Sequence, residues 1–167
     1  KIHEEFEGTP NFYHDIALLK NELHVQLSNL ILPICFPSRF FTFPKYFEVS
    51  SWGLTEKGPL FPDILRKAML IRRSDDYCKS QWIAEVDFKP QYQFCAGTEI
   101  QTCSGDSGST LTGRKYGLYF AEGITSFGLF QCGVSMFPSI YTKVRSYISW
   151  VKKNMEGDVF CQPYGAN

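Results

Sequence analysis

The chain has 167 residues, and its 17 basic side chains balance 17 acidic ones, so the formal net charge is zero. This balance gives no general electrostatic reason to expect a nucleic acid or an anionic membrane as a partner. No stretch approaches the roughly 18 apolar residues of a membrane span, and no charged-then-apolar leader opens the chain, which indicates a removed signal or a missing N-terminal part.

Short apolar stretches rich in β-branched and aromatic residues recur along the chain, separated by Gly, Pro, Ser and Asn. In chain order they are residues 16–19, 30–34, 47–49, 68–71, 118–124 and 140–144. Several short strands at such spacing are typical of a sandwich or barrel. We therefore predict an all-β fold.

The pattern changes near the C-terminus. Apolar residues recur at helical spacing, and lysines follow where cations suit the helix dipole. These apolar residues are Val144, Tyr147, Ile148 and Val151. The spacing predicts a helix over residues 146–155.

Six cysteines stand at positions 35, 78, 95, 103, 132 and 161, without the paired Cys-x-x-Cys spacing of a zinc site. We expect disulfides, and no metal or cofactor. Disulfides form in oxidising compartments, which favours a secreted, extracellular protein.

Residues 102–109 place Ser107 between Asp106 and Gly108, with Gly105 and Cys103 before them. A serine nucleophile needs an exposed hydroxyl beside a base and backbone N–H groups aimed at the oxyanion that it creates. Glycines allow the close approach and the dihedral angles that such a site requires. A Gly-Asp-Ser-Gly run is also typical of an ordinary turn, so the motif alone leaves both interpretations open.

Seven short motifs stand in order along the chain. They are FYHDIALLK from Phe12, LPICFP from Leu32, WGLT from Trp52, FCAG from Phe94, TCSGDSGS from Thr102, GITSFG from Gly123 and YTKV from Tyr141. This ordered set resembles the chymotrypsin-like, trypsin-fold serine proteases. The resemblance covers almost the whole chain and implies a protease that is incomplete at its N-terminus.

The resemblance implies an all-β fold: the second antiparallel β-barrel of a two-barrel fold, the last strands of the first barrel and a C-terminal helix. Residues 1–30 are then a remnant of the first barrel, and residues 31–48 connect the barrels. Residues 49–145 form the second barrel with the nucleophile and the specificity pocket, 146–156 the C-terminal helix and 157–167 an irregular tail.

The resemblance also assigns catalytic roles. Ser107 is the expected nucleophile, the N–H groups of Gly105 and Ser107 are the expected oxyanion hole, and Asp15 is the carboxylate that orients a catalytic histidine. In the family's mechanism the carboxylate fixes the imidazole tautomer while the N–H donors stabilise the transition state.

The expected general base is absent, because the family places its histidine well upstream of the Asp15 motif. His14 adjoins Asp15, and neighbouring side chains of an extended segment point to opposite faces, so His14 does not fit the base position. His3 and His24 are expected on the surface. The chain is therefore expected to lack the general base.

In the family, the aspartate before the nucleophile, here Asp106, pairs with a new N-terminus that activation cleavage releases. The sequence from Lys1 to Glu4 does not fit that N-terminus. Since a buried, unpaired carboxylate costs about 3–5 kcal/mol, we expect Asp106 to turn outward and leave the oxyanion hole unformed.

The resemblance pairs Cys78 with Cys95 and Cys103 with Cys132. The partner of Cys35 stays open: it is either a missing N-terminal segment or Cys161 in the tail.

Five residues are expected to bind substrate by resemblance. They are Gln101, Ser126, Phe127, Gly128 and Ser139. Glutamine at the base of the specificity pocket supplies no charge, and serine in place of a glycine narrows the pocket, so we expect a preference for uncharged side chains.

The resemblance therefore implies a secreted serine endopeptidase, acting on a protein or peptide substrate through an acyl-enzyme, as a fragment that is inactive as it stands. The alternative is a non-catalytic homologue that acts as a binding or cofactor protein. Asp15, Gly105 and Ser107 favour the enzyme, because a binding module has no physical need of all three. The Ser109-Thr110 pair, which replaces the usual Gly-Pro, favours divergence.

Overall fold

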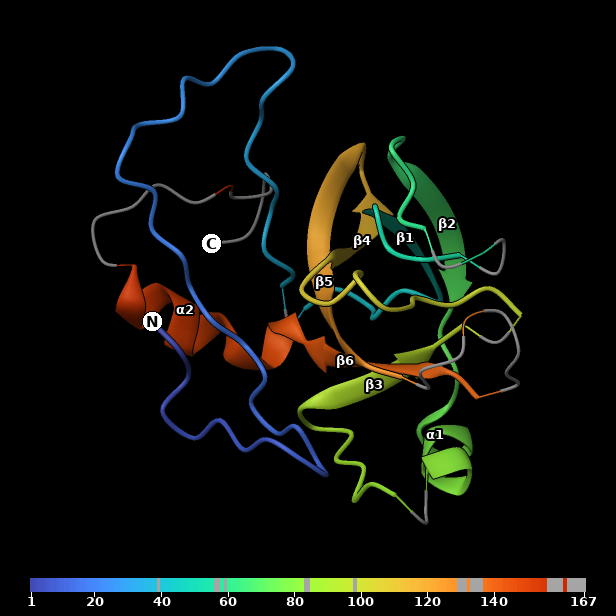
Figure 1. Cartoon of the computed structure of the whole chain (residues 1–167). Helices are drawn as coiled ribbons and strands as arrows, with labels where there is room; N and C mark the ends of the chain where they lie inside the picture. Colours follow the sequence, from blue (N-terminus) through green and yellow to red (C-terminus); the bar gives the residue numbers. More distant parts are fainter. Residues whose placement is uncertain are drawn as a thin grey trace.

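The computed structural model describes residues 1–38, 40–55, 58, 60–82, 85–97, 99–128, 132, 137–155 and 161. Its elements (Figure 1) are β1 (Tyr46–Ser51), β2 (Arg66–Ile71), α1 (Asp75–Trp82), β3 (Gln93–Ala96), β4 (Thr110–Lys115), β5 (Leu118–Phe127), β6 (Ser139–Lys143), a 3₁₀ turn (Val144–Tyr147) and α2 (Ile148–Asn154). This confirms the predicted mostly-β fold with a C-terminal helix. No helix of the described residues is long and apolar enough to cross a membrane.

The six strands form one antiparallel sheet in the order β2-β1-β4-β5-β6-β3. Its two edge strands meet, because Arg72 and Ala96 form an antiparallel bridge. There the N–H of Arg73 donates to the Cys95 carbonyl at 3.0 Å, and the N–H of Gly97 donates to the Ile71 carbonyl at 2.9 Å. The sheet thus curls back on itself as a barrel.

Alternating side chains fill the inside of this barrel. In β1, for example, Phe47 and Val49 are buried whereas Tyr46 and Ser50 are exposed, as expected of a strand with one face on a core. The central cluster consists of Phe47, Val49, Leu70, Phe94, Ala96, Leu111 and Tyr141. A second cluster packs α1 against β3 and β6 through residues that include Cys78, Trp82, Cys95 and Ile140.

Four of the predicted apolar stretches, 47–49, 68–71, 118–124 and 140–144, fall largely within β1, β2, β5 and β6. The predicted C-terminal helix exists, but the chain first forms a 3₁₀ turn at Val144 and then α2, which ends at Asn154. Sequence reasoning missed α1, β3 and β4. A signal for α1 was present: Ser74 caps it by accepting the Tyr77 N–H at 3.2 Å, with Asp75 and Asp76 in its first turn.

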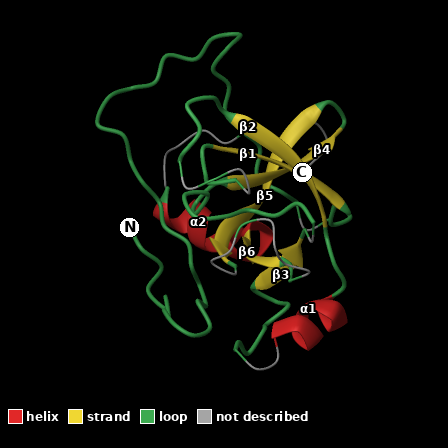
Figure 2. Ribbon diagram, turned by 45° about the vertical axis from the view of Figure 1, so that its right-hand side comes forward, coloured by secondary structure: helices red, strands yellow, loops and turns green. Residues whose placement is uncertain are grey.

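The stretches 16–19 and 30–34, predicted as strands, do not form strands. Within the described part of residues 1–45, isolated bridges such as Ile2 with Ala17 and Ser28 with Ile31 take the place of ladders. A strand needs a neighbour for its N–H and C=O groups. Residues 19–34, all exposed, project away from the sheet (Figures 1 and 2), whereas Asp15 and Ile16 before them contact the barrel and α2.

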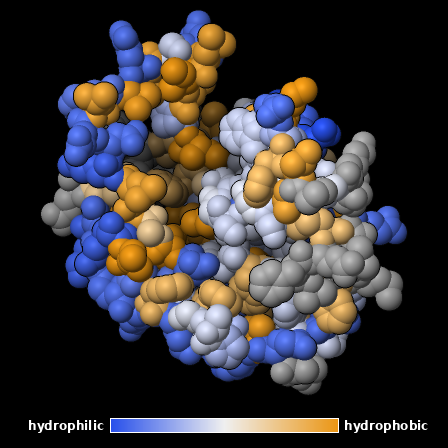
Figure 3. Space-filling model, viewed as in Figure 1, coloured by the Kyte–Doolittle hydropathy of each residue, from blue (hydrophilic) through white to orange (hydrophobic). Residues whose placement is uncertain are grey.

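The projecting segment carries exposed apolar side chains, as Figure 3 shows. They include Leu19, Leu23, Val25, Leu27, Leu30 and Leu32. Exposed apolar surface of this kind favours association.

Three disulfides join the chain. Cys78–Cys95 and Cys103–Cys132 are the pairs that the resemblance implied, and Cys35 bonds to Cys161 in this structure. Cys35 also lies along β5: its N–H donates to the Tyr119 carbonyl at 3.0 Å, and its carbonyl accepts the Ala121 N–H at 2.9 Å. The connector between residues 31 and 48 is thus held to the barrel wall.

A buried ion pair joins Glu122 of β5 to Arg145 of the 3₁₀ turn, and Arg145 also contacts the connector. The Arg145 Nη2 donates to both carboxylate oxygens of Glu122 at 3.1 and 2.8 Å, and its Nη1 donates to the Phe41 carbonyl at 3.0 Å. The guanidinium also lies 4.4 Å from the centre of the Phe43 ring. Burial raises the pKa of Glu122, and the hydrogen bond from Arg145 opposes that rise. The Arg145 Nε stays buried without a hydrogen-bond partner, so the pair is incompletely satisfied.

Replacing Arg145→Met should lower the free energy of unfolding by about 3–5 kcal/mol, because it leaves the Glu122 carboxylate buried without its cation. Urea denaturation of the chain measures this loss. The double variant Glu122→Leu/Arg145→Met should recover most of it, since an apolar pair of similar volume needs no compensation. A double variant as unstable as the single one would contradict this account of the pair.

Candidate active site

The loop that carries Ser107 is a chain of tight turns ahead of β4. Gly105 and Gly108 both have positive φ, 89° and 80°, a region that other residues enter at a cost. A Cβ on Gly105 would also lie 2.5 Å from the Phe61 ring. The Asp106 N–H donates to the Cys103 carbonyl at 2.9 Å. Ser107 is exposed at the tip of this loop.

The N–H groups of Gly105 and Ser107 have no acceptor among the described residues, whereas those that follow them are paired. The Gly108 N–H donates to the Thr125 carbonyl and the Ser109 N–H to the Asp106 carbonyl, each at 2.9 Å. By contrast, the N–H groups of Gly105 and Ser107 make no hydrogen bond within the residues that the structure describes. These are the two donors predicted to bind an oxyanion, and that role stays a prediction.

The prediction that Asp106 turns outward is wrong. Asp106 is only 8% exposed, and its Oδ1 accepts the Gly53 N–H at 2.9 Å while its Oδ2 accepts the Cys103 N–H at 2.7 Å. Hydrogen bonds from backbone N–H groups stabilise a buried carboxylate, and the prediction left them out. The carboxylate also borders a cavity of about 280 Å³ that Gly53, Gln101 and Cys103 help to line.

Asp15 is held by two hydroxyl groups. Its Oδ2 accepts the Ser126 hydroxyl at 2.6 Å, and its carbonyl accepts the Thr142 hydroxyl at 2.8 Å. Ser126 is the extra residue of a β-bulge, because Thr125 and Phe127 pair with consecutive residues of β6. A bulge re-aims a side chain, and here it turns Ser126 to the carboxylate. Sequence reasoning assigned Ser126 to substrate binding and missed this contact and that of Thr142.

A second cavity, of about 500 Å³, lies beside Ser107. Ser107, Ser126, Phe127 and Gly128 line it, with Phe12 and Trp82 as apolar walls. The Phe12 and Phe127 rings lie 4.9 Å apart. The structure therefore brings together four of the predicted nucleophile and substrate residues.

The other two predicted substrate residues lie elsewhere. Gln101 lines the 280 Å³ cavity next to Asp106. Ser139 is 1% exposed and lies against Gly128, where an added Cβ would come 2.8 Å from the Ser139 Oγ. It narrows the space behind Gly128 and is not exposed to a substrate. The roles of both residues stay predictions.

None of the three histidines, all of which the structure describes, hydrogen-bonds to Asp15 or Ser107. His14 instead contacts Tyr147 and Tyr92. The prediction assumed an extended segment, which is wrong at His14, because its φ is 54°. His24 is exposed, as predicted. His3 is half-buried, so its expected surface position is wrong: its ring packs on those of His14 and Trp150.

Replacing Gly53→Ala should lower the free energy of unfolding by about 1–3 kcal/mol, the usual cost of overpacking. The added Cβ would lie 2.0 Å from the Asp106 Oδ1 and would displace the carboxylate. Gly8→Ala is the matched control, because nothing lies within 4 Å of its added Cβ. Equal urea midpoints for the two variants would show that Asp106 does not occupy this position.

The family model described as Trypsin matches residues 1–151. Ovochymase of Halocynthia roretzi is 35% identical over 158 residues, which are 90% of this chain and 10% of that protein. Trypsin-1 of Astacus astacus is 31% identical over 156 residues, 92% of this chain and 64% of that protein.

The fold has a close counterpart among solved structures. Neuropsin, described as a serine protease expressed in the limbic system of mouse brain, superposes with a TM-score of 0.79 at 26% identity, over 93% of this chain and 69% of that chain. The chain spans less than two thirds of the length of ovochymase and Trypsin-1. On its sequence and its fold, the chain belongs to the trypsin family of chymotrypsin-like serine proteases.

Proposed function

We propose that the protein to which this chain belongs is a secreted serine endopeptidase with Ser107 as its nucleophile. The observation that carries the proposal is the loop around Ser107, where the Gly105 and Ser107 N–H groups have no acceptor among the described residues, while those of Asp106, Gly108 and Ser109 are satisfied. Because Gly105 and Ser107 are both exposed, a ligand can reach both donors. Both donors remain available to a developing oxyanion.

Asp15 belongs to the same site in this proposal. Its partner Ser126 lines the cavity that Ser107 also lines, and in this proposal a histidine lies between the Asp15 carboxylate and Ser107. The histidine takes the Ser107 proton as the hydroxyl attacks the scissile carbonyl, and Asp15 stabilises the imidazolium that forms. The histidine then protonates the leaving amine, and water releases the acyl group.

The histidine must come from outside these 167 residues, since none of the three present contacts Asp15 or Ser107. Loss of a triad histidine costs about 10⁶ in kcat on the subtilisin precedent. The chain by itself is therefore inactive in this proposal.

Asp106 is the proposed receptor of an activating N-terminus. Its carboxylate borders the 280 Å³ cavity and already accepts two N–H groups. An α-ammonium group entering that cavity would form a charge-assisted hydrogen bond with the Asp106 carboxylate. The Ser107 loop would already have its shape before this bond forms. In this proposal, the N-terminus therefore stabilises the loop and does not create it.

The proposed substrates have uncharged side chains at the primary position. The walls of the 500 Å³ cavity, Phe12, Trp82 and Phe127, are aromatic, and such walls favour apolar groups. Ser139 behind Gly128 reduces the depth that a long side chain could reach.

A non-catalytic role as a binding or cofactor protein is the second candidate, and the Ser109-Thr110 pair, in place of the family's usual Gly-Pro, favours it. This support is weak, because both residues have structural roles: the Ser109 hydroxyl lies 2.8 Å from the Thr125 hydroxyl, and Thr110 pairs with Ile124 at the start of β4.

An organophosphonate that phosphonylates activated serines tests the proposal. The 167-residue chain should show no labelling, and the protein extended upstream to include the family's histidine segment should be labelled at Ser107. Ser107→Ala should abolish the labelling, while Ser104→Ala, an exposed neighbour, should retain it. Asp15→Asn should lower kcat about 10⁴-fold.

Two outcomes would contradict the proposal. If a folded, extended protein is not labelled, the non-catalytic alternative holds. If the 167-residue chain is labelled stoichiometrically, a group within it acts as the base and the assignment of the histidine is wrong.

A further inference from the structure

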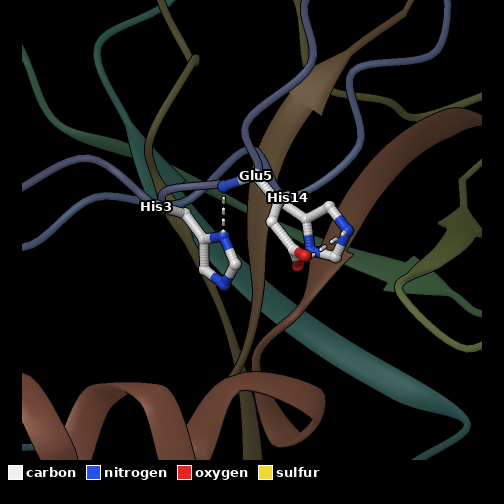
Figure 4. A group of neighbouring side chains, drawn as sticks. All are labelled: His3, Glu5 and His14. Carbon is white, nitrogen blue, oxygen red and sulfur yellow. Dashed lines mark hydrogen bonds and ion pairs between the residues drawn. The ribbon is translucent and has the colours of Figure 1, made fainter.

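Two histidines and a glutamate meet outside the candidate active site. His3, Glu5 and His14 each place one potential ligand atom within 4.8 Å of the other two (Figure 4). His3 and Glu5 come from the start of the chain and His14 from the segment that returns beside it. None of the three takes part in the proposed catalytic mechanism.

The backbone fixes the distance between the two histidines. The His3 N–H donates to the Ile16 carbonyl at 3.1 Å, and the Ile16 N–H donates to the His14 carbonyl at 2.8 Å. Farther along, the Leu18 N–H donates to the Lys1 carbonyl at 2.8 Å. The imidazoles therefore start from adjacent, paired segments, which reduces the conformational entropy lost when both bind one ion.

His14 is oriented as a metal-binding histidine is. Its Nδ1 lies 3.3 Å from the Tyr147 hydroxyl, and its Nε2 lies 4.0 Å from the Glu5 Oε2. In the tautomer whose Nδ1–H donates to the Tyr147 hydroxyl, Nε2 keeps its lone pair for an ion on the side of the Glu5 carboxylate, and such a partner on the other ring nitrogen orients metal-binding histidines generally.

His3 can complete the set if its ring turns, because it now stacks on the His14 ring with centres 4.8 Å and planes 17° apart, whereas an imidazole nitrogen binds a metal in the plane of its ring. The His3 Nδ1 accepts the Glu5 N–H at 3.2 Å, a long hydrogen bond that a metal–nitrogen bond can replace. The Glu5 side chain is 77% exposed, so its carboxylate can shift without disturbing packing.

We propose that His3, Glu5 and His14 form a zinc site. Imidazole nitrogens with a carboxylate oxygen are a common donor set for Zn²⁺, whereas Ca²⁺ and Mg²⁺ prefer oxygen ligands alone. Bond lengths of 2.0–2.2 Å place tetrahedral ligands about 3.4 Å apart. The most distant pair of ligand atoms, now within 4.8 Å, must therefore approach by roughly 1.4 Å when the ion binds. Three protein ligands leave the fourth position to water.

A bound zinc ion would restrain the segment that leads into the candidate active site. Asp15 directly follows His14, and Trp150 of α2 holds the same segment through its Nε1, which donates to the Glu4 carboxylate at 2.7 Å. Zinc would link His3 to His14 and so close residues 3–14 into one loop that directly precedes Asp15. The same rings also form an aromatic cluster with Tyr147 and Trp150, and the test below separates packing from metal binding.

Calorimetric titration of the whole 167-residue chain with Zn²⁺ should show one site with 1:1 stoichiometry. Glu5→Gln, His3→Ala and His14→Ala should each weaken binding at least about tenfold, the effect that even outer partners of a metal ligand have. His24→Ala and Glu22→Gln, both in the exposed segment 21–30, should bind as the unchanged chain does. Glu5→Gln keeps the side-chain volume, so its result does not depend on the folding of the histidine variants.

Co²⁺ supplies a second readout. Bound at this site it should give the strong visible absorption of four- or five-coordinate cobalt and quench the fluorescence of Trp150, whose ring lies 4.9 Å from that of His3. No binding, or binding that Glu5→Gln and His14→Ala leave unchanged, would overturn the proposal. Neither readout uses peptidase activity, so failure here would leave the proposed protease function standing.

Discussion

The buried carboxylate of Asp106 is the contact on which the candidate site depends. It accepts the N–H groups of Gly53 and Cys103, which come from the loop after β1 and from the Ser107 loop itself. Only glycine at position 53 leaves room for it. With Asp106 held inside, the following turn exposes Ser107, and the N–H groups of Gly105 and Ser107 have no acceptor in the part of the chain that the structure describes. Two ordinary hydrogen bonds thereby keep the loop in a shape that could stabilise an oxyanion.

Asp15 is positioned by side-chain hydroxyl groups rather than by backbone N–H groups. It lies in a segment that forms no strand, yet its carboxylate and carbonyl are each fixed by a hydroxyl of the barrel, from Ser126 and Thr142. The bulge at Ser126 makes the first of these contacts. The burial of Ile16 against Tyr147 and Val151 adds apolar contact with the C-terminal helix. The barrel thus positions a carboxylate that its own strands do not carry.

The sequence predicted those features that rest on local pattern. The short apolar stretch 47–49 predicted β1, helical spacing predicted α2, and the motif resemblance implied the disulfides of Cys78 and Cys103. It failed where a residue depends on distant partners. The apolar residues 30–34 have the composition of a strand and no strand to pair with, and the position of Asp106 depends on an N–H group 53 residues away. The cluster of His3 and His14 likewise follows from pairing between separate segments, which no spacing in the sequence encodes.

The central claim is that Asp106 holds the Ser107 loop in place without an activating N-terminus. Amide hydrogen exchange of the 167-residue chain, resolved by residue, tests it most directly. The account predicts slow exchange at Gly53 and Cys103, whose N–H groups donate to the buried carboxylate, and fast exchange at Gly105 and Ser107. Fast exchange at Gly53 and Cys103 would show that Asp106 has left its pocket and would contradict the account.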